Sequence, residues 1–126
     1  MPDSRLTLST LLSLKKRRER RIRREIARLE EEWQQVEQRK RQLLQAHQQL
    51  WQQWRESSSQ EQTLTSLQWR LLRAQLAGYY QQDHHLQAQV AATDDMFAHL
   101  QRDKDEQQLL LRQVLMDQEK LNILME

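Results

Sequence analysis

Apolar residues recur along the first half of the chain at alternating spacings of four and three positions. The fourteen positions of this stripe are Leu8, Leu12, Lys15, Glu19, Ile22, Ile26, Leu29, Trp33, Val36, Lys40, Leu43, His47, Leu50 and Trp54, and ten of them are apolar. A repeat of 3.5 residues stays on one side of a helix over such a length only if the helix supercoils around a partner. The pattern therefore predicts a coiled-coil helix over about residues 5–56.

A second stripe with the same spacing follows in the other half of the chain. Its seventeen positions, twelve of them apolar, are Trp69, Leu72, Leu76, Tyr79, Asp83, Leu86, Val90, Thr93, Phe97, Leu100, Lys104, Gln107, Leu111, Val114, Gln118, Leu121 and Met125. They predict a second helix over about residues 61–124. The turn between the helices is expected at about residues 57–60, because three consecutive serines there compete for backbone hydrogen bonds. Ser59 and Gln62 have the spacing of a capping box for the second helix.

A short turn between two long amphipathic helices makes them antiparallel neighbours. We therefore predict an all-α fold: a long two-helix antiparallel coiled-coil hairpin, which forms one elongated rod-like domain over residues 1–126. A turn centred near residues 59–60 gives facing residues whose numbers sum to about 119, so that Leu43 faces Leu76 and Leu50 faces Trp69. The same register places Lys15 against Lys104 in a loose layer of like charge, and it leaves the residues after about 118 without a partner.

The composition favours an extended helical protein over a globular enzyme. Of the 126 residues, 37% are hydrophobic, against roughly 45–50% in a typical globular domain. One glycine and one proline leave little to punctuate loops. The sequence has no cysteine, no glycine-rich phosphate loop and no recognisable pair of nucleophile and base. We predict no catalytic residue, no cofactor and no small-molecule substrate.

The four histidines do not form a metal-binding motif. They are His47, His84, His85 and His99. The neighbours His84 and His85 point about 100° apart on a helix, and no His-Glu-x-x-His or comparable spacing occurs. We predict no metal site.

A basic segment lies inside the first stripe and is the first candidate partner-binding feature. Its eight cationic residues are Lys15, Lys16, Arg17, Arg18, Arg20, Arg21, Arg23 and Arg24. Three interpretations remain: a solvated helix face, a contact with nucleic acid, and a contact with an acidic protein surface. A basic helix that leads into heptads is the arrangement of bZIP proteins. Proteins of that family read a base with an asparagine of the basic helix, and this sequence has no asparagine before Asn122.

Two further candidate partner-binding features are apolar. In the predicted register, the C-terminal residues Leu121, Ile123, Leu124 and Met125 lie beyond the first helix, and an exposed apolar end favours a partner. Trp51 lies beside the stripe near the predicted hairpin tip. It is either part of the core or an exposed anchor, because tryptophan is enriched in interface hot spots.

The sequence shows neither a secretory signal nor a membrane span. The first six residues lack an apolar region with a small-residue cleavage site, and no apolar run approaches the roughly 20 residues that a membrane helix needs. We expect a cytoplasmic protein that does not insert into a membrane.

The chain resembles the FliJ/YscO/HrpO family, the stalk proteins of flagellar and type III secretion export systems. The resemblance is carried by the leucine-rich start over 8–14, the basic segment over 15–24 and the heptads on both sides of residues 57–59. It covers nearly the whole chain and rests on architecture and composition. The glutamine- and tryptophan-rich character is most similar to the HrpO branch.

The resemblance implies a non-enzymatic central stalk at the cytosolic base of the secretion apparatus. Its termini are expected to enter the hexamer of the type III secretion ATPase, and its coiled coil to contact the export gate protein and secretion chaperones. No residue role is carried over, because the family offers no motif to match. The alternative is a self-standing coiled-coil scaffold, or a coiled coil that binds nucleic acid without specificity through residues 15–24.

Overall fold

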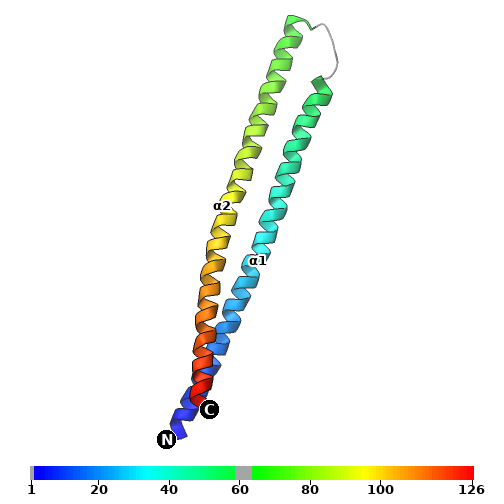
Figure 1. The fold of residues 1–126 in the computed structure, drawn as a ribbon. Coiled ribbons are helices and arrows are strands. Elements are labelled where there is room, and N and C mark those ends of the chain that lie inside the picture. The colour runs from blue at the N-terminus through cyan, green and yellow to red at the C-terminus, as the bar shows by residue number, and fades with distance from the viewer. Residues whose placement is uncertain (1, 59–63) are drawn as a thin grey trace. The chain divides into compact units, whose positions relative to one another are not determined.

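The protein is an all-α helical hairpin, as its heptad stripes predict (Figure 1). The computed structural model describes residues 2–58 and 64–126. Helix α1 spans Pro2–Ser58 and helix α2 spans Ser66–Met125, and the described residues contain no strand. The chain forms two compact units, each containing a stretch of both helices. We call Met1–Gln34 with Ala98–Glu126 the terminal unit, and Gln35–Phe97 the loop unit.

Side chains near the loop define where the helices end and begin. In the last turn of α1, the hydroxyl of Ser57 donates to the carbonyl of Trp54 over 3.1 Å, and the hydroxyl of Ser58 donates to that of Arg55 over 3.5 Å. At the start of α2, the N–H of Gln68 donates to the Thr65 hydroxyl over 3.2 Å, and the N–H of Thr65 donates to Gln68 Oε1 over 2.8 Å. This reciprocal pair is a capping box. It places the start of α2 at Ser66, five residues later than expected.

Part of the predicted turn lies outside the described residues. Residues 59 and 60 belong to the range that the structure does not describe, and so does the capping box predicted for Ser59 and Gln62. Residues 57 and 58 of the predicted turn belong to the last turn of α1.

Both predicted stripes form the helix–helix contact. Every one of the fourteen positions on α1 is buried or half-buried. On α2 the same holds for sixteen of the seventeen, and the exception is Trp69. The buried apolar residues of the terminal unit are Ile22, Leu29, Leu100 and Val114, and those of the loop unit are Leu43 and Leu50. The heptad frames of both helices are therefore confirmed, apart from Trp69.

The predicted register is wrong by two heptads, as the terminal unit shows. Lys15 Nζ lies 3.1 Å from Asp117 Oδ2, and the numbers of these residues add up to 132. Lys104 Nζ lies 3.3 Å from Glu30 Oε1, and their numbers add up to 134. Facing residues thus sum to about 133 in place of 119. Each lysine meets a carboxylate, so the predicted layer of like charge between Lys15 and Lys104 does not form.

The loop unit has the same register within itself. Lys40 Nζ lies 2.9 Å from Asp94 Oδ1, and their numbers add up to 134. The Trp54 ring lies 5.4 Å from the Tyr79 ring, with numbers that add up to 133. A shift of two heptads moves each apolar position onto an equivalent one, so it preserves both stripes. Leu43 accordingly lies at the level of residue 90 and not of Leu76.

We predict that the neighbours Leu43 and Leu44 differ strongly in their effect on stability. Leu43 is 5% exposed and Leu44 is 49% exposed. Leu43→Ala should reduce the free energy of unfolding by roughly 2–5 kcal/mol, because it leaves a cavity in the helix–helix contact. Leu44→Ala should change it by no more than about 0.5 kcal/mol. Urea unfolding followed by circular dichroism measures both values, and equal losses would contradict the heptad frame.

Candidate partner-binding surfaces

The basic segment on α1 is largely exposed in the terminal unit. Of its eight cations, only Lys15 is half-buried. Two of the eight have ion-pair partners: Lys15 pairs with Asp117, and Arg23 Nε donates to Glu19 Oε2 over 2.9 Å. The other six form no ion pair with the described residues, and they are Lys16, Arg17, Arg18, Arg20, Arg21 and Arg24. These six cations are available to an acidic partner.

Polar contacts hold the inner side of the basic segment against α2. The ammonium of Lys15 donates to Asp117, and this hydrogen bond lowers the pKa of the Asp117 carboxyl below its ordinary value. The Gln118 amide donates to Glu19 over 2.9 Å, and this bond, followed by that from Arg23, lowers the pKa of Glu19. Glu19 lies on the first stripe and Asp117 lies beside the second. Their contacts fix this part of α1 against α2, so the exposed cations stay on the outward face of α1.

A ladder of charges follows the basic segment on α1. Arg28 Nε donates to Glu25 Oε2 over 3.0 Å, and a second guanidinium nitrogen pairs with Glu32 four residues further on. The pairing with Glu25 raises the pKa of Arg28 above its ordinary value. The acidic residues beyond the basic segment therefore neutralise Arg28 within the helix, while the six cations before it remain unpaired among the described residues.

The C-terminal residues do not extend beyond α1 as a free tail. Leu121 and Met125 are half-buried, and in the observed register they lie at the levels of residues 12 and 8 of α1. Ile123 and Leu124 are exposed, at 61% and 66%. The prediction of a tail without a partner is therefore wrong, because it depended on the wrong register. Only Ile123 and Leu124 of the four predicted residues face outward.

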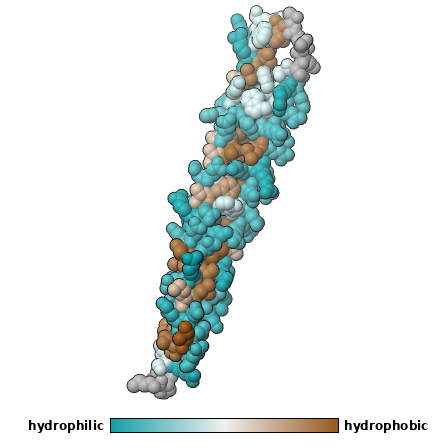
Figure 2. Space-filling model, in the orientation of Figure 1, coloured by the Kyte–Doolittle hydropathy of each residue, from teal (hydrophilic) through white to brown (hydrophobic). Residues whose placement is uncertain are grey.

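Ile123 and Leu124 belong to a longer apolar surface on α2, which we call the outer stripe. Its exposed residues are Leu109, Leu110, Met116, Ile123 and Leu124. Three of them follow one another at intervals of seven, so they lie on one helix face, away from the contact with α1. Figure 2 shows brown apolar side chains toward the end of the molecule that carries both termini. The seven-residue spacing of Leu109 and Met116 is visible in the sequence. The heptad prediction considered only the stripe of each helix that packs against the other helix, which we call the main stripe.

A polar layer interrupts the apolar contact in the loop unit. Asp83 lies on the main stripe of α2, where the predicted register placed it opposite Val36. Its Oδ1 instead accepts a hydrogen bond of 2.8 Å from the indole N–H of Trp51, and it also contacts His47 Nε2. Gln87 donates to Oδ2 over 3.0 Å. The bond from Trp51, followed by that from His47, lowers the pKa of Asp83.

The structure places Trp51 within this layer. It is half-buried, and its ring lies 5.3 Å from the ring of Tyr80 and 6.5 Å from that of Tyr79. Its use as a partner anchor stays a prediction. Trp69 is more exposed, at 50%, although its place on the second stripe predicts that it is buried against α1.

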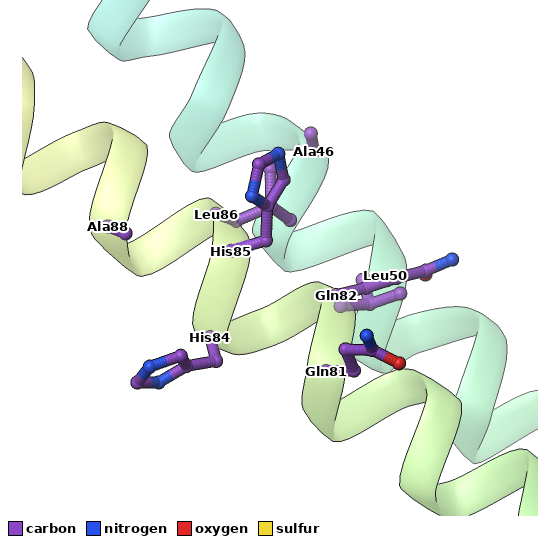
Figure 3. Close-up of a pocket in the computed structure, with 8 residues that line it drawn as sticks. All are labelled: Ala46, Leu50, Gln81, Gln82, His84, His85, Leu86 and Ala88. Carbon is purple, nitrogen blue, oxygen red and sulfur yellow. The ribbon is translucent and has the colours of Figure 1, made fainter.

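An open hollow beside this layer brings two histidines near the surface, but on different sides of α2. Its volume is about 720 Å³, and its lining residues are Ala46, Leu50, Gln81, Gln82, His84, His85, Leu86 and Ala88. Figure 3 shows that His85 points toward α1, whereas His84 projects away from it. Within the described ranges, no group of three His, Cys, Asp or Glu side chains is arranged to hold a metal ion.

Similarity to known proteins gives no function for this chain. No family model, curated protein or solved structure matches it. In residues 2–58 and 64–126, neither helix has a stretch long and apolar enough to cross a lipid bilayer. The features available for a functional inference are therefore the six unpaired cations, the outer stripe and the loop end of α2.

We predict that Asp83 makes the hairpin sensitive to acid. Because the folded state lowers the pKa of Asp83, its ionised form stabilises the fold fully above roughly pH 5, and this stabilisation is lost as the pH falls through the lowered value. Asp83→Asn should lower the melting temperature at pH 7 and flatten its decline below pH 5. Circular dichroism melting curves between pH 3 and pH 7 measure both effects. Asp95→Asn, at an exposed position of α2, is the control, and equal curves for the two variants would contradict this role of Asp83.

Proposed function

We propose that this chain is a non-enzymatic adaptor whose terminal unit docks, as a central stalk, into the ring of a type III secretion ATPase. One observation carries the proposal: the terminal unit combines six exposed cations on α1, which form no ion pair with the described residues, with the exposed outer stripe on α2. The resemblance of the sequence to export stalk proteins supplies the identity of the ring.

The two features of the terminal unit have complementary physical effects. Clustered cations raise the rate of association with an acidic surface, and they disfavour the binding of basic partners. The outer stripe gains free energy when its leucine, isoleucine and methionine side chains leave water. Apolar contacts have no hydrogen-bond geometry to satisfy, so they tolerate small rotations of the docked hairpin relative to the ring. Protein docking uses both features, whereas phosphate binding uses only the cations.

The remaining parts of the proposal follow from the resemblance. The export gate protein and the secretion chaperones contact the coiled coil outside the docked end. The protein works in the cytoplasm, at the base of the secretion apparatus. It has no active site of its own, so its effect on ATP hydrolysis arises from how it packs against the ring.

The observed register changes how the C-terminal residues are tested. Deletion of residues 118–126 would remove the bond from Gln118 to Glu19 and the half-buried Leu121 and Met125. It would therefore damage the hairpin as well as the docking surface. Substitution of the exposed Ile123 and Leu124 alone avoids this problem.

We predict that charge and apolar contact both contribute to ATPase binding. Arg17→Glu with Arg21→Glu, and separately Ile123→Ser with Leu124→Ser, should each weaken binding to the purified ATPase at least about tenfold, equivalent to 1.4 kcal/mol. Far-UV circular dichroism should stay at the wild-type value, because all four side chains are exposed. Arg39→Glu with Arg102→Glu changes the net charge equally and should bind normally. Titration calorimetry measures the affinities, and normal binding by both test variants would refute the stalk proposal.

The same variants test the alternative of nucleic-acid binding. A coiled coil that holds duplex DNA through residues 15–24 should lose affinity in the arginine variant and keep it in the Ile123 and Leu124 variant. Its binding constant should also fall steeply as salt concentration rises, because each phosphate contact releases counterions. This pattern, together with normal ATPase binding, would favour the alternative.

A further inference from the structure

In the observed register, α1 ends before it reaches the level of the first residues of α2, so no part of α1 packs against the start of α2. In the loop unit, the ring contacts of Trp54 with Tyr79 and of Trp51 with Tyr80 fix which residues lie at the same level. The last residue of α1, Ser58, then lies near the level of residue 75. The stretch Ser66–Ala74 extends beyond it, as Figure 1 shows where α2 begins. We call this stretch the overhang.

The overhang is apolar on two opposite sides. With 100° between successive residues, Leu67 and Leu71 lie on one side of the helix, and Trp69 and Leu72 lie on the other. Leu67 and Leu71 are exposed, as is Trp69. The side with Trp69 and Leu72 continues the main stripe of α2, which farther along the loop unit is covered by α1. Leu72 is half-buried and Trp69 is exposed, so the apolar surface that packs against α1 farther along becomes exposed toward the start of α2.

Positive charge separates the two apolar sides along one edge of the overhang. Arg70 and Arg73 lie there, and residues 66–74 contain no acidic residue. Both arginines are exposed, and neither forms an ion pair with the described residues. The opposite edge carries Gln68, whose side chain is engaged in the capping box. The charge that a partner must supply is thus negative, and it must lie along one edge.

We propose that the overhang is a docking element that inserts into an apolar cleft of a partner protein whose rim carries Asp or Glu side chains. A helix that is apolar on opposite sides is normally enclosed, whereas a membrane surface covers one face only. A second copy that packed its own overhang against this one would bring two more arginines near Arg70 and Arg73. Tryptophan and arginine are the side chains that most often dominate the binding energy of protein interfaces. A protein cleft with carboxylates therefore fits better than a membrane or a second copy.

This docking element is separate from the terminal surface described above. The overhang belongs to the loop unit, and the basic segment and outer stripe belong to the terminal unit. Arg17→Glu with Arg21→Glu should therefore leave docking of the overhang unchanged. The inference does not depend on the identity of the ring.

Site-specific photocrosslinking in the cells that make the protein tests the inference. Benzoylphenylalanine replaces Ala74, which is exposed and lies on the side of Leu67 and Leu71. The expected result is an adduct with one other protein, and mass spectrometry of the crosslinked peptide should show apolar residues beside Asp or Glu. The same substitution at Ala91, an exposed position elsewhere on α2, is the position control and should not give this adduct.

Two variants connect the adduct to the proposed chemistry. Trp69→Ser with Leu71→Ser, and separately Arg70→Glu with Arg73→Glu, should each reduce the adduct at least about tenfold, because tryptophan and arginine dominate interface binding energy. Arg39→Glu with Arg102→Glu has the same change in net charge and should keep the adduct. Circular dichroism of each purified variant confirms that the hairpin remains folded.

Several results would overturn the inference. They are an adduct only with a second copy of the chain, an adduct only with lipid, a partner peptide without acidic residues, and no adduct above that seen at Ala91. An adduct that survives both overhang variants would overturn it as well.

Discussion

Charged and polar side chains on or beside the main stripes determine how the two helices of this hairpin align. An apolar heptad stripe fits its partner equally well after a shift of one or two heptads, because each shift sets apolar positions against apolar positions again. Lys104 meets Glu30 in the observed alignment, whereas two heptads away, in the alignment that the turn suggested, it would face Lys16. Lys40 likewise meets Asp94 and would otherwise face Tyr80. A charge left unpaired at the helix–helix contact is costly. These contacts therefore select the register, while the apolar residues supply most of the burial.

The selected register determines which residues near the two ends of α2 are covered by α1. The alignment packs Leu121 and Met125 against α1 and leaves the outer stripe as the exposed apolar surface of the terminal unit. It also leaves Ser66–Ala74 beyond the last turn of α1, so that Trp69 is half exposed. A register two heptads away would bury Trp69 and expose the C-terminal residues. The same sequence would then present a different surface at each end.

The sequence predicted the local structure well and the alignment poorly, for a physical reason. Periodicity identified both helices and their buried faces, because a helix position repeats every 3.6 residues. The register was inferred from a turn at 57–60, but α2 begins only after the Thr65 capping box. Asp83 is visible in the sequence as a polar residue on the second stripe, but its partners Trp51 and His47 could be found only once the register was known. The partners of both surfaces remain proposals, because chemistry on a surface indicates the kind of partner and not its name.

Distances between spin labels at exposed positions test the register most directly. Labels at Gln49 and His84 lie at the same level in the observed register, whereas Gln49 and Arg70 are offset by 14 residues, about 21 Å along the helix axis. All three positions are exposed, so the labels leave the helix–helix contact intact. Pulsed electron paramagnetic resonance should give a clearly shorter distance for Gln49 with His84 than for Gln49 with Arg70. The reverse order would show that the helices align as the turn alone suggested, and it would contradict the role assigned to the polar contacts.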